Sequence, residues 1–96
     1  MPELTAKERA RLKARAHALE PNVSVGNAGA TAAVIAEVER ALAKHELIKV
    51  KIQIDDREHR RQLGDEIGNA TDAAVVHRVG KVTILWRPKP EKEDAD

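Results

Sequence analysis

The chain has 96 residues, the length of one domain, and 34% of them are charged. It contains no cysteine, which excludes disulfide frameworks, thiolate metal sites and cysteine nucleophiles. Apolar stretches are short and the N-terminal segment is charged, so the sequence predicts neither a membrane span nor a signal peptide. We expect a soluble cytoplasmic protein, with one folded domain at residues 1–87 and a disordered acidic tail at residues 88–96.

The net charge of +1 hides an uneven distribution of charge. The last nine residues carry four acidic side chains, whereas the body of the chain is modestly basic. Basic residues gather between Lys7 and Arg15 and again between Lys49 and Arg61. Such clusters suit a polyanionic partner, although an ordinary solvated helix surface would have the same composition.

The first half of the chain predicts two helices separated by a short strand. Residues 5–18 form a helix that starts with a capping box of Thr5 and Glu8, and its apolar stripe is Leu12, Ala16 and Leu19. Pro21 ends this segment. A strand at residues 23–25 and a turn at residues 26–29 follow, and a second helix runs from Thr31 to about residue 44.

Residues 47–54 carry the clearest strand pattern in the chain. Apolar and polar side chains alternate, so one face of the strand is apolar and the other is wet and basic: Ile48, Val50, Ile52 and Ile54 against Lys49, Lys51 and Gln53. Asp55 or Asp56 caps a third helix over residues 57–69. Two further strands, residues 73–79 and 81–87, form a hairpin around Gly80-Lys81.

The order of these segments predicts an α/β protein, a compact α-β-α-β-α-β-β sandwich with a four-stranded mixed sheet. Crossover connections make the first three strands parallel neighbours, and the hairpin adds the fourth antiparallel to them. Because residues 47–54 alternate, one face of the sheet should stay open at Lys49 and Lys51.

The segment Gly26-Asn27-Ala28-Gly29 is a G-x-x-G loop between a strand and a helix. Glycines at both corners allow a sharp turn and the close approach of another backbone. The following helix directs free N–H groups at whatever docks there, which favours phosphate. KH domains grip nucleic-acid backbones with such loops. A plain strand-to-helix turn would also explain two glycines at this spacing.

The sequence also resembles the YhbY-like family of CRM (chloroplast RNA splicing and ribosome maturation) domains. The resemblance extends over nearly all of residues 1–87, and three motifs carry it: Val25-Gly26-Asn27-Ala28-Gly29, His45-Glu46-Leu47-Ile48-Lys49-Val50-Lys51 and Leu85-Trp86-Arg87. Two features depart from the family pattern. Ala30 replaces a larger apolar residue, and the acidic tail is additional.

The resemblance implies a fold similar to the C-terminal domain of translation initiation factor three, with RNA as the ligand and no cofactor. It also implies a role with precursors of the large ribosomal subunit, as in single-domain bacterial members. We therefore expect a monomeric, non-enzymatic ribosome assembly factor that binds ribosomal RNA rather than DNA. The candidate RNA contacts are Gly26, Asn27, Ala28, Gly29, Lys49 and Lys51, with Arg11 and Arg15 nearby and Arg57, Arg60 and Arg61 at the periphery.

Other functions have weaker support in the sequence. A protein–protein adaptor that docks on ribosomal proteins or an assembly GTPase would need a large exposed apolar patch. The four histidines lack the spacing of a metal site, so we expect no bound metal, and no set of nucleophile and base suggests an enzyme. Trp86, the only aromatic residue, could stack on a base, but packing in the core explains it better.

Overall fold

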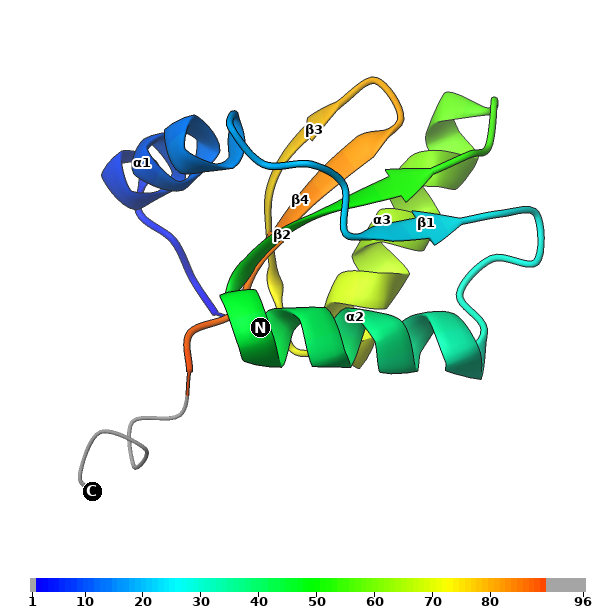
Figure 1. The fold of residues 1–96 in the computed structure, drawn as a ribbon. Helices are drawn as coiled ribbons and strands as arrows, with labels where there is room; N and C mark the ends of the chain where they lie inside the picture. The colour runs from blue at the N-terminus through cyan, green and yellow to red at the C-terminus, as the bar shows by residue number, and fades with distance from the viewer. Residues whose placement is uncertain (1, 90–96) are drawn as a thin grey trace.

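The structure, a computed structural model, describes residues 2–89. Figure 1 shows the described elements in chain order: α1 (Ala6–Ala16), β1 (Val23–Val25), α2 (Ala32–His45), β2 (Leu47–Ile52), α3 (Arg57–Ala70), β3 (Ala74–Val79) and β4 (Val82–Trp86). The predicted α/β class and the predicted order of elements are confirmed. The predicted tail lies mostly outside the described residues, which end at Lys89.

The four strands form one mixed sheet in the order β1-β2-β4-β3. β1 pairs with β2 in parallel, and β4 is antiparallel to both of its neighbours, β2 and β3. The expectation that the first three strands are parallel neighbours is therefore wrong for β3, because β4 lies between it and β2. Ile84 and Leu85 point to opposite faces of β4 and both are buried, which suits a central strand.

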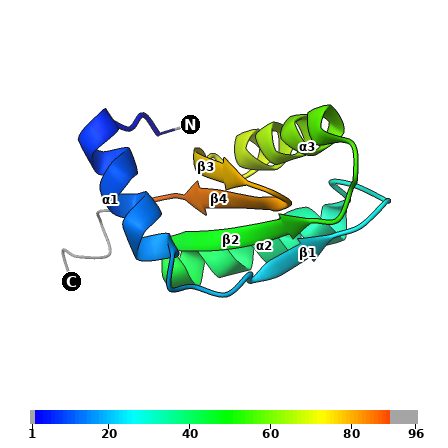
Figure 2. The same ribbon diagram turned by 90° about the horizontal axis from the view of Figure 1, so that it is seen from above.

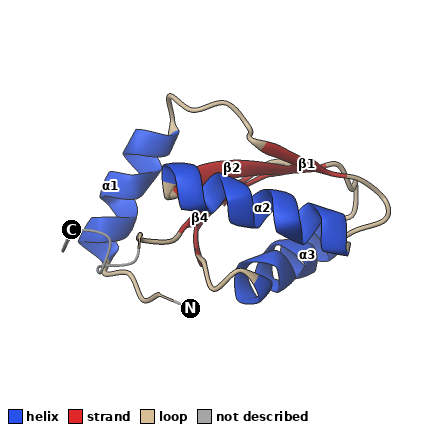
Figure 3. Ribbon diagram, turned by 60° about the horizontal axis from the view of Figure 1, so that its bottom comes forward, coloured by secondary structure: helices blue, strands red, loops and turns tan. Residues whose placement is uncertain are grey.

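The larger hydrophobic core lies between one face of the sheet and the helices α2 and α3, which lie side by side against it in Figure 3. Ile48, Val50 and Ile52 of β2 point into this core and are at most 1% exposed. Val38 and Leu42 of α2 and Ile67 of α3 face them. The apolar side of the alternating strand is therefore buried as predicted.

A smaller core lies on the opposite face of the sheet, where α1 covers one end (Figure 2). Leu12 and Ala16 of α1 pack there against Leu47, Val76 and Ile84. The basic face of the sheet is thus open over only part of its length, which corrects the prediction of an open face. Leu19 does not belong to the apolar stripe, because α1 ends at Ala16 and Leu19 is 36% exposed.

Local capping signals set the starts of all three described helices. Thr5 and Glu8 form the predicted capping box of α1, and Thr31 accepts a hydrogen bond from the Val34 N–H at the start of α2. Asp56, rather than Asp55, caps α3 by accepting from the Glu58 N–H. None of the helices between residues 2 and 89 combines the length and the apolar character that a membrane span needs.

Candidate nucleic-acid interface

Three connections gather at one end of the sheet, which lies opposite α1 in Figures 1 and 2. β1, β2 and β3 run in the same direction, so the segments that follow them meet at this end: the G-x-x-G loop, residues 53–56 and the Gly80-Lys81 turn. Backbone hydrogen bonds join them, from Ile52 N–H to Lys81 C=O (2.7 Å) and from Gln53 N–H to Val25 C=O (2.8 Å). In open α/β sheets, ligands bind at the carboxyl ends of parallel strands.

The two glycines of the loop have different structural roles. Gly29 has φ of +77°, and a Cβ added there would lie 3.3 Å from the Leu63 side chain. The fold therefore requires glycine at this corner. Gly26 has no positive φ, and a Cβ added there would meet no atom within 4 Å. The fold itself therefore does not require glycine at position 26. A glycine at such a position is expected where the backbone of a ligand approaches the protein closely.

The loop and the start of α2 present unpaired backbone donors. The N–H groups of Asn27 and Ala28 have no hydrogen-bond partner among residues 2–89, and both residues are exposed. The first turn of α2 contains no acidic residue, whereas the first turns of α1 and α3 contain Glu8 and Glu58. The positive end of the α2 dipole therefore has no local counter-charge, and the arrangement suits a phosphate group.

The two lysines of β2 lie on the same face of the sheet but in different surroundings. Lys51 is exposed and pairs in register with Ser24 of β1 and Val82 of β4, near the end where the loop lies. Lys49 is only partly exposed, and its ammonium donates a hydrogen bond to the Leu19 carbonyl at 2.9 Å. Lys51 is thus available to a ligand, while Lys49 holds the α1–β1 connection against the sheet.

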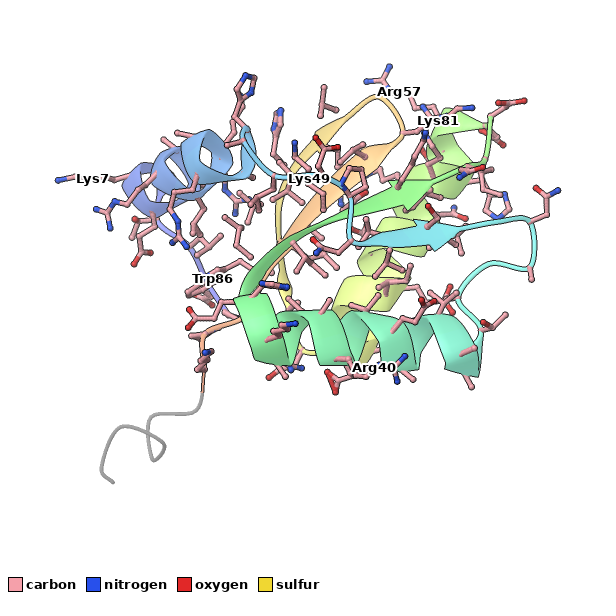
Figure 4. The ribbon with its side chains drawn as sticks, viewed as in Figure 1. Lys7, Arg40, Lys49, Arg57, Lys81 and Trp86 are labelled. Carbon is pink, nitrogen blue, oxygen red and sulfur yellow. The ribbon has the colours of Figure 1, made fainter. Side chains whose placement is uncertain are left out.

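The three arginines at the start of α3 also differ. Arg60 donates to the carbonyl oxygens of Ile54 (2.7 Å) and Asp55 (2.8 Å), so it stabilises the segment between β2 and α3. Arg57 and Arg61 are exposed, and their side chains have no hydrogen-bond or ionic partner among the described residues. Figure 4 shows Arg57 close to the β3–β4 turn.

The structure does not bring the basic residues of α1 close to the loop. α1 lies at the other end of the molecule, whose longest dimension is 43 Å (Figure 1). Arg11 is exposed there, and Arg15 lines a shallow depression together with His45, the last residue of α2, and Leu47, the first residue of β2. Arg11 and Arg15, which were expected beside the lysines of the sheet face, therefore lie at the end of the sheet away from the G-x-x-G loop.

Sequence reasoning missed a groove beside β3. Basic side chains from α1, α3 and the β3–β4 hairpin line it, among them Arg9, Arg78 and Lys81. Arg78 and Lys81 could have been noticed as cations on an exposed strand end and turn. The position of Arg9 in the groove could not be foreseen from the sequence, because its contact with β3 joins residues more than sixty positions apart.

Two other predictions concern single residues and metals. Trp86 is partly buried against the smaller core with Leu12, in agreement with a packing role. Within residues 2–89, no cluster of three or more His, Asp or Glu side chains is arranged to hold a metal ion.

The chain is similar to known proteins over almost its entire length. Residues 4–87 match the family described as the CRS1/YhbY (CRM) domain. An RNA-binding protein of Haemophilus influenzae is 43% identical over 91 residues, with 95% of this chain and 92% of that protein covered. A probable RNA-binding protein of Pseudomonas aeruginosa is 41% identical, with 93% and 88% covered. The solution structure of a hypothetical protein from Staphylococcus aureus superposes with a TM-score of 0.83 at 25% identity and 96% coverage of each chain.

Proposed function

Because this chain belongs to the CRS1/YhbY (CRM) domain family, we propose that it is an RNA-binding protein that acts on ribosomal RNA in precursors of the large ribosomal subunit. Two relatives at more than 40% identity are named as an RNA-binding protein and a probable RNA-binding protein. The observation that carries the proposal is Gly26, an exposed glycine that the fold does not require, next to backbone donors that have no partner among residues 2–89.

The G-x-x-G loop binds the RNA backbone directly. A phosphate accepts hydrogen bonds from the N–H groups of Asn27 and Ala28 and lies at the positive end of α2. The missing Cβ at Gly26 leaves room for the ribose–phosphate chain to pass close to the loop. Lys51, on the neighbouring strand β2, adds a cation near the same end of the sheet.

This set of contacts recognises shape and charge more than sequence. The chain has one aromatic residue, and Trp86 packs against the smaller core, so the stacking platform of RRM or OB domains is missing. Backbone contacts position a protein on its ligand but carry little sequence information. A folded RNA such as ribosomal RNA presents phosphates in a fixed arrangement that suits this mode of binding.

A role as a protein–protein adaptor has less support. Among residues 2–89, the exposed large apolar side chains are Leu19 and Val79, which lie on different parts of the molecule and form no extended patch. The site also offers backbone donors and cations rather than a nucleophile and base, so we propose no enzymatic activity.

Crosslinking in living cells tests the proposal. The tagged chain is crosslinked to RNA, purified under denaturing conditions, and the attached RNA is sequenced. We expect precursor large-subunit RNA to be enriched over messenger and small-subunit RNA. A variant with Gly26→Leu serves as the matched control and should recover much less RNA at equal protein abundance. Equal recovery of all RNA classes, or no RNA at all, would contradict the assignment to large-subunit precursors.

A further inference from the structure

A long groove follows the free edge of β3, the outermost strand on its side of the sheet. It runs from Arg9 of α1 past His77 to the Gly80-Lys81 turn and the first turns of α3. Six basic side chains and two acidic ones line it: Arg9, Arg57, Arg60, Arg61, Arg78 and Lys81 against Asp56 and Glu58. The groove is therefore strongly basic in a chain whose net charge is +1.

Four of these cations have no acidic partner within residues 2–89. Arg78 forms an ion pair with Asp65, and Lys81 forms one with Asp55. Arg9 and Arg60 bind backbone carbonyl oxygens, which hold the guanidinium groups in place without neutralising them. The side chains of Arg57 and Arg61 have no partner among the described residues. All four guanidinium groups thus contribute positive charge to the groove, and those of Arg9 and Arg60 are held in place by their bonds to the backbone.

The same contacts make the edge of β3 a poor site for an added peptide strand. Arg9 donates to the carbonyl oxygens of Val75 (2.6 Å) and Val76 (2.9 Å), which are acceptors that an incoming strand would need. The register also shifts between Val75 and His77, as in a β-bulge. Bulges and charged side chains on edge strands prevent the addition of further strands. The groove thus suits a flexible polyanion better than a peptide.

We propose that this groove binds a second stretch of sugar–phosphate backbone of the same RNA molecule that the G-x-x-G loop holds, an inference that rests on the proposed function. The groove and the loop both reach the same end of the sheet, the groove along the edge strand β3 and the loop after the opposite edge strand β1. With strands ~4.8 Å apart, these edges are separated by about 14 Å. An RNA that lies across this end contacts both, with Lys51 of β2 between them.

RNA probes of two different lengths distinguish binding at the G-x-x-G loop from binding at the groove. A short oligouridylate of about four nucleotides, the length that a G-x-x-G loop clamps in KH domains, is fully engaged by the loop and leaves no nucleotide for the groove. An oligouridylate several times longer can reach both. Backbone contacts do not depend on base sequence, so this simple probe is suitable. Binding is measured by fluorescence anisotropy over a series of salt concentrations.

The groove variant is Arg57→Ala with Arg61→Ala, and its matched control is Arg40→Ala with Lys44→Ala. Each removes two exposed cations, and Figure 4 shows Arg40 on the side of α2 away from the sheet. We expect the groove variant to bind the short probe as the wild type does. On the long probe its affinity should fall about tenfold, and the slope of log K against log salt should decrease by about 1.4. The control should change neither.

Each alternative result has a definite meaning. If the groove variant and the control bind the long probe equally well, or both lose the same affinity, the groove does not bind RNA and the inference is wrong. If Gly26→Leu leaves binding of the short probe intact while the groove variant loses affinity for the long one, the loop proposal fails and the groove remains supported. If the wild type binds neither probe, the proposed function and the groove inference fail together. Thermal melting followed by circular dichroism confirms that every variant is folded.

Discussion

Replacing Gly26 and Gly29 one at a time separates the requirements of folding from those of binding. At Gly26 an added Cβ meets no atom within 4 Å and φ is not positive. Gly26→Ala should therefore leave stability unchanged or raise it by up to about 1 kcal/mol, since alanine restricts the unfolded chain. At Gly29 φ is +77° and the Leu63 side chain is close. Gly29→Ala should cost about 1–2 kcal/mol.

The effect of Gly26→Ala on RNA binding should be large despite this neutral effect on stability. A methyl group at the contact moves the phosphate away from the N–H donors of Asn27 and Ala28. A hydrogen bond to a charged group is worth about 1.5–3 kcal/mol, so the loss of one reduces affinity about 10- to 100-fold. Gly26→Leu should reduce it further, because the longer side chain covers more of the loop.

Two measurements on the same samples check this pair of expectations. Chemical denaturation gives the free energy of unfolding, and anisotropy with a labelled fragment of large-subunit ribosomal RNA gives the affinity. The reasoning predicts loss of affinity without loss of stability for Gly26→Ala, and loss of stability for Gly29→Ala. It is refuted if Gly26→Ala and Gly26→Leu both bind RNA as tightly as the wild type.

Four further variants test other parts of the structure. Lys51→Ala should weaken RNA binding and lower the slope of log K against log salt by about 0.7. Lys49→Ala should leave that slope unchanged and cost about 0.5–1.5 kcal/mol of stability, because the bond to the Leu19 carbonyl is lost. Equal slopes for the two variants would contradict the different surroundings of the two lysines. Thr31→Ala removes the cap of α2 and should lower the free energy of unfolding by about 1 kcal/mol, which corresponds to a fall of about 4–8 °C in the melting temperature measured by calorimetry. An unchanged melting temperature would show that the cap is unimportant. Leu42→Ala, in the larger core, should cost about 2–5 kcal/mol in denaturant titrations, and a cost below 1 kcal/mol would mean that α2 packs loosely.

The parts of the fold that depend on nearby residues could be predicted from the sequence. The capping box of Thr5 and Glu8 places the start of α1, and the alternation around Val50 identifies both the strand and its buried face. The Gly80 turn likewise defines the β3–β4 hairpin, because a positive φ is needed there. Each of these features depends on side chains only a few positions apart.

Contacts between distant segments could not be predicted in the same way. The hairpin could join the sheet by either strand, and a crossover connection does not decide which. A signal was nevertheless present, because Ile84 and Leu85 are apolar on both faces of β4, while β3 ends in His77, Arg78 and the exposed Val79. The partial cover of the basic face by α1 follows from the same kind of packing.

The candidate site was predicted in part. The G-x-x-G loop and Lys51 lie at one end of the sheet, as the motif order suggests. The bonds of Lys49 and Arg60 to backbone carbonyls and the separation of Arg15 from the loop depend on how the helices pack. Charge clusters in a sequence do not show which cations are held by the protein itself.

The central claim is that the backbone of the G-x-x-G loop contacts RNA phosphates directly. Amide hydrogen exchange resolved by NMR, with and without a fragment of large-subunit ribosomal RNA, tests it at the atoms concerned. Asn27 and Ala28 are exposed, and their N–H groups have no hydrogen-bond partner in the described part of the chain. These amides should therefore exchange fast in the free protein and become strongly protected when RNA is bound. If these two amides exchange at the same rate with saturating RNA, the loop does not bind the backbone.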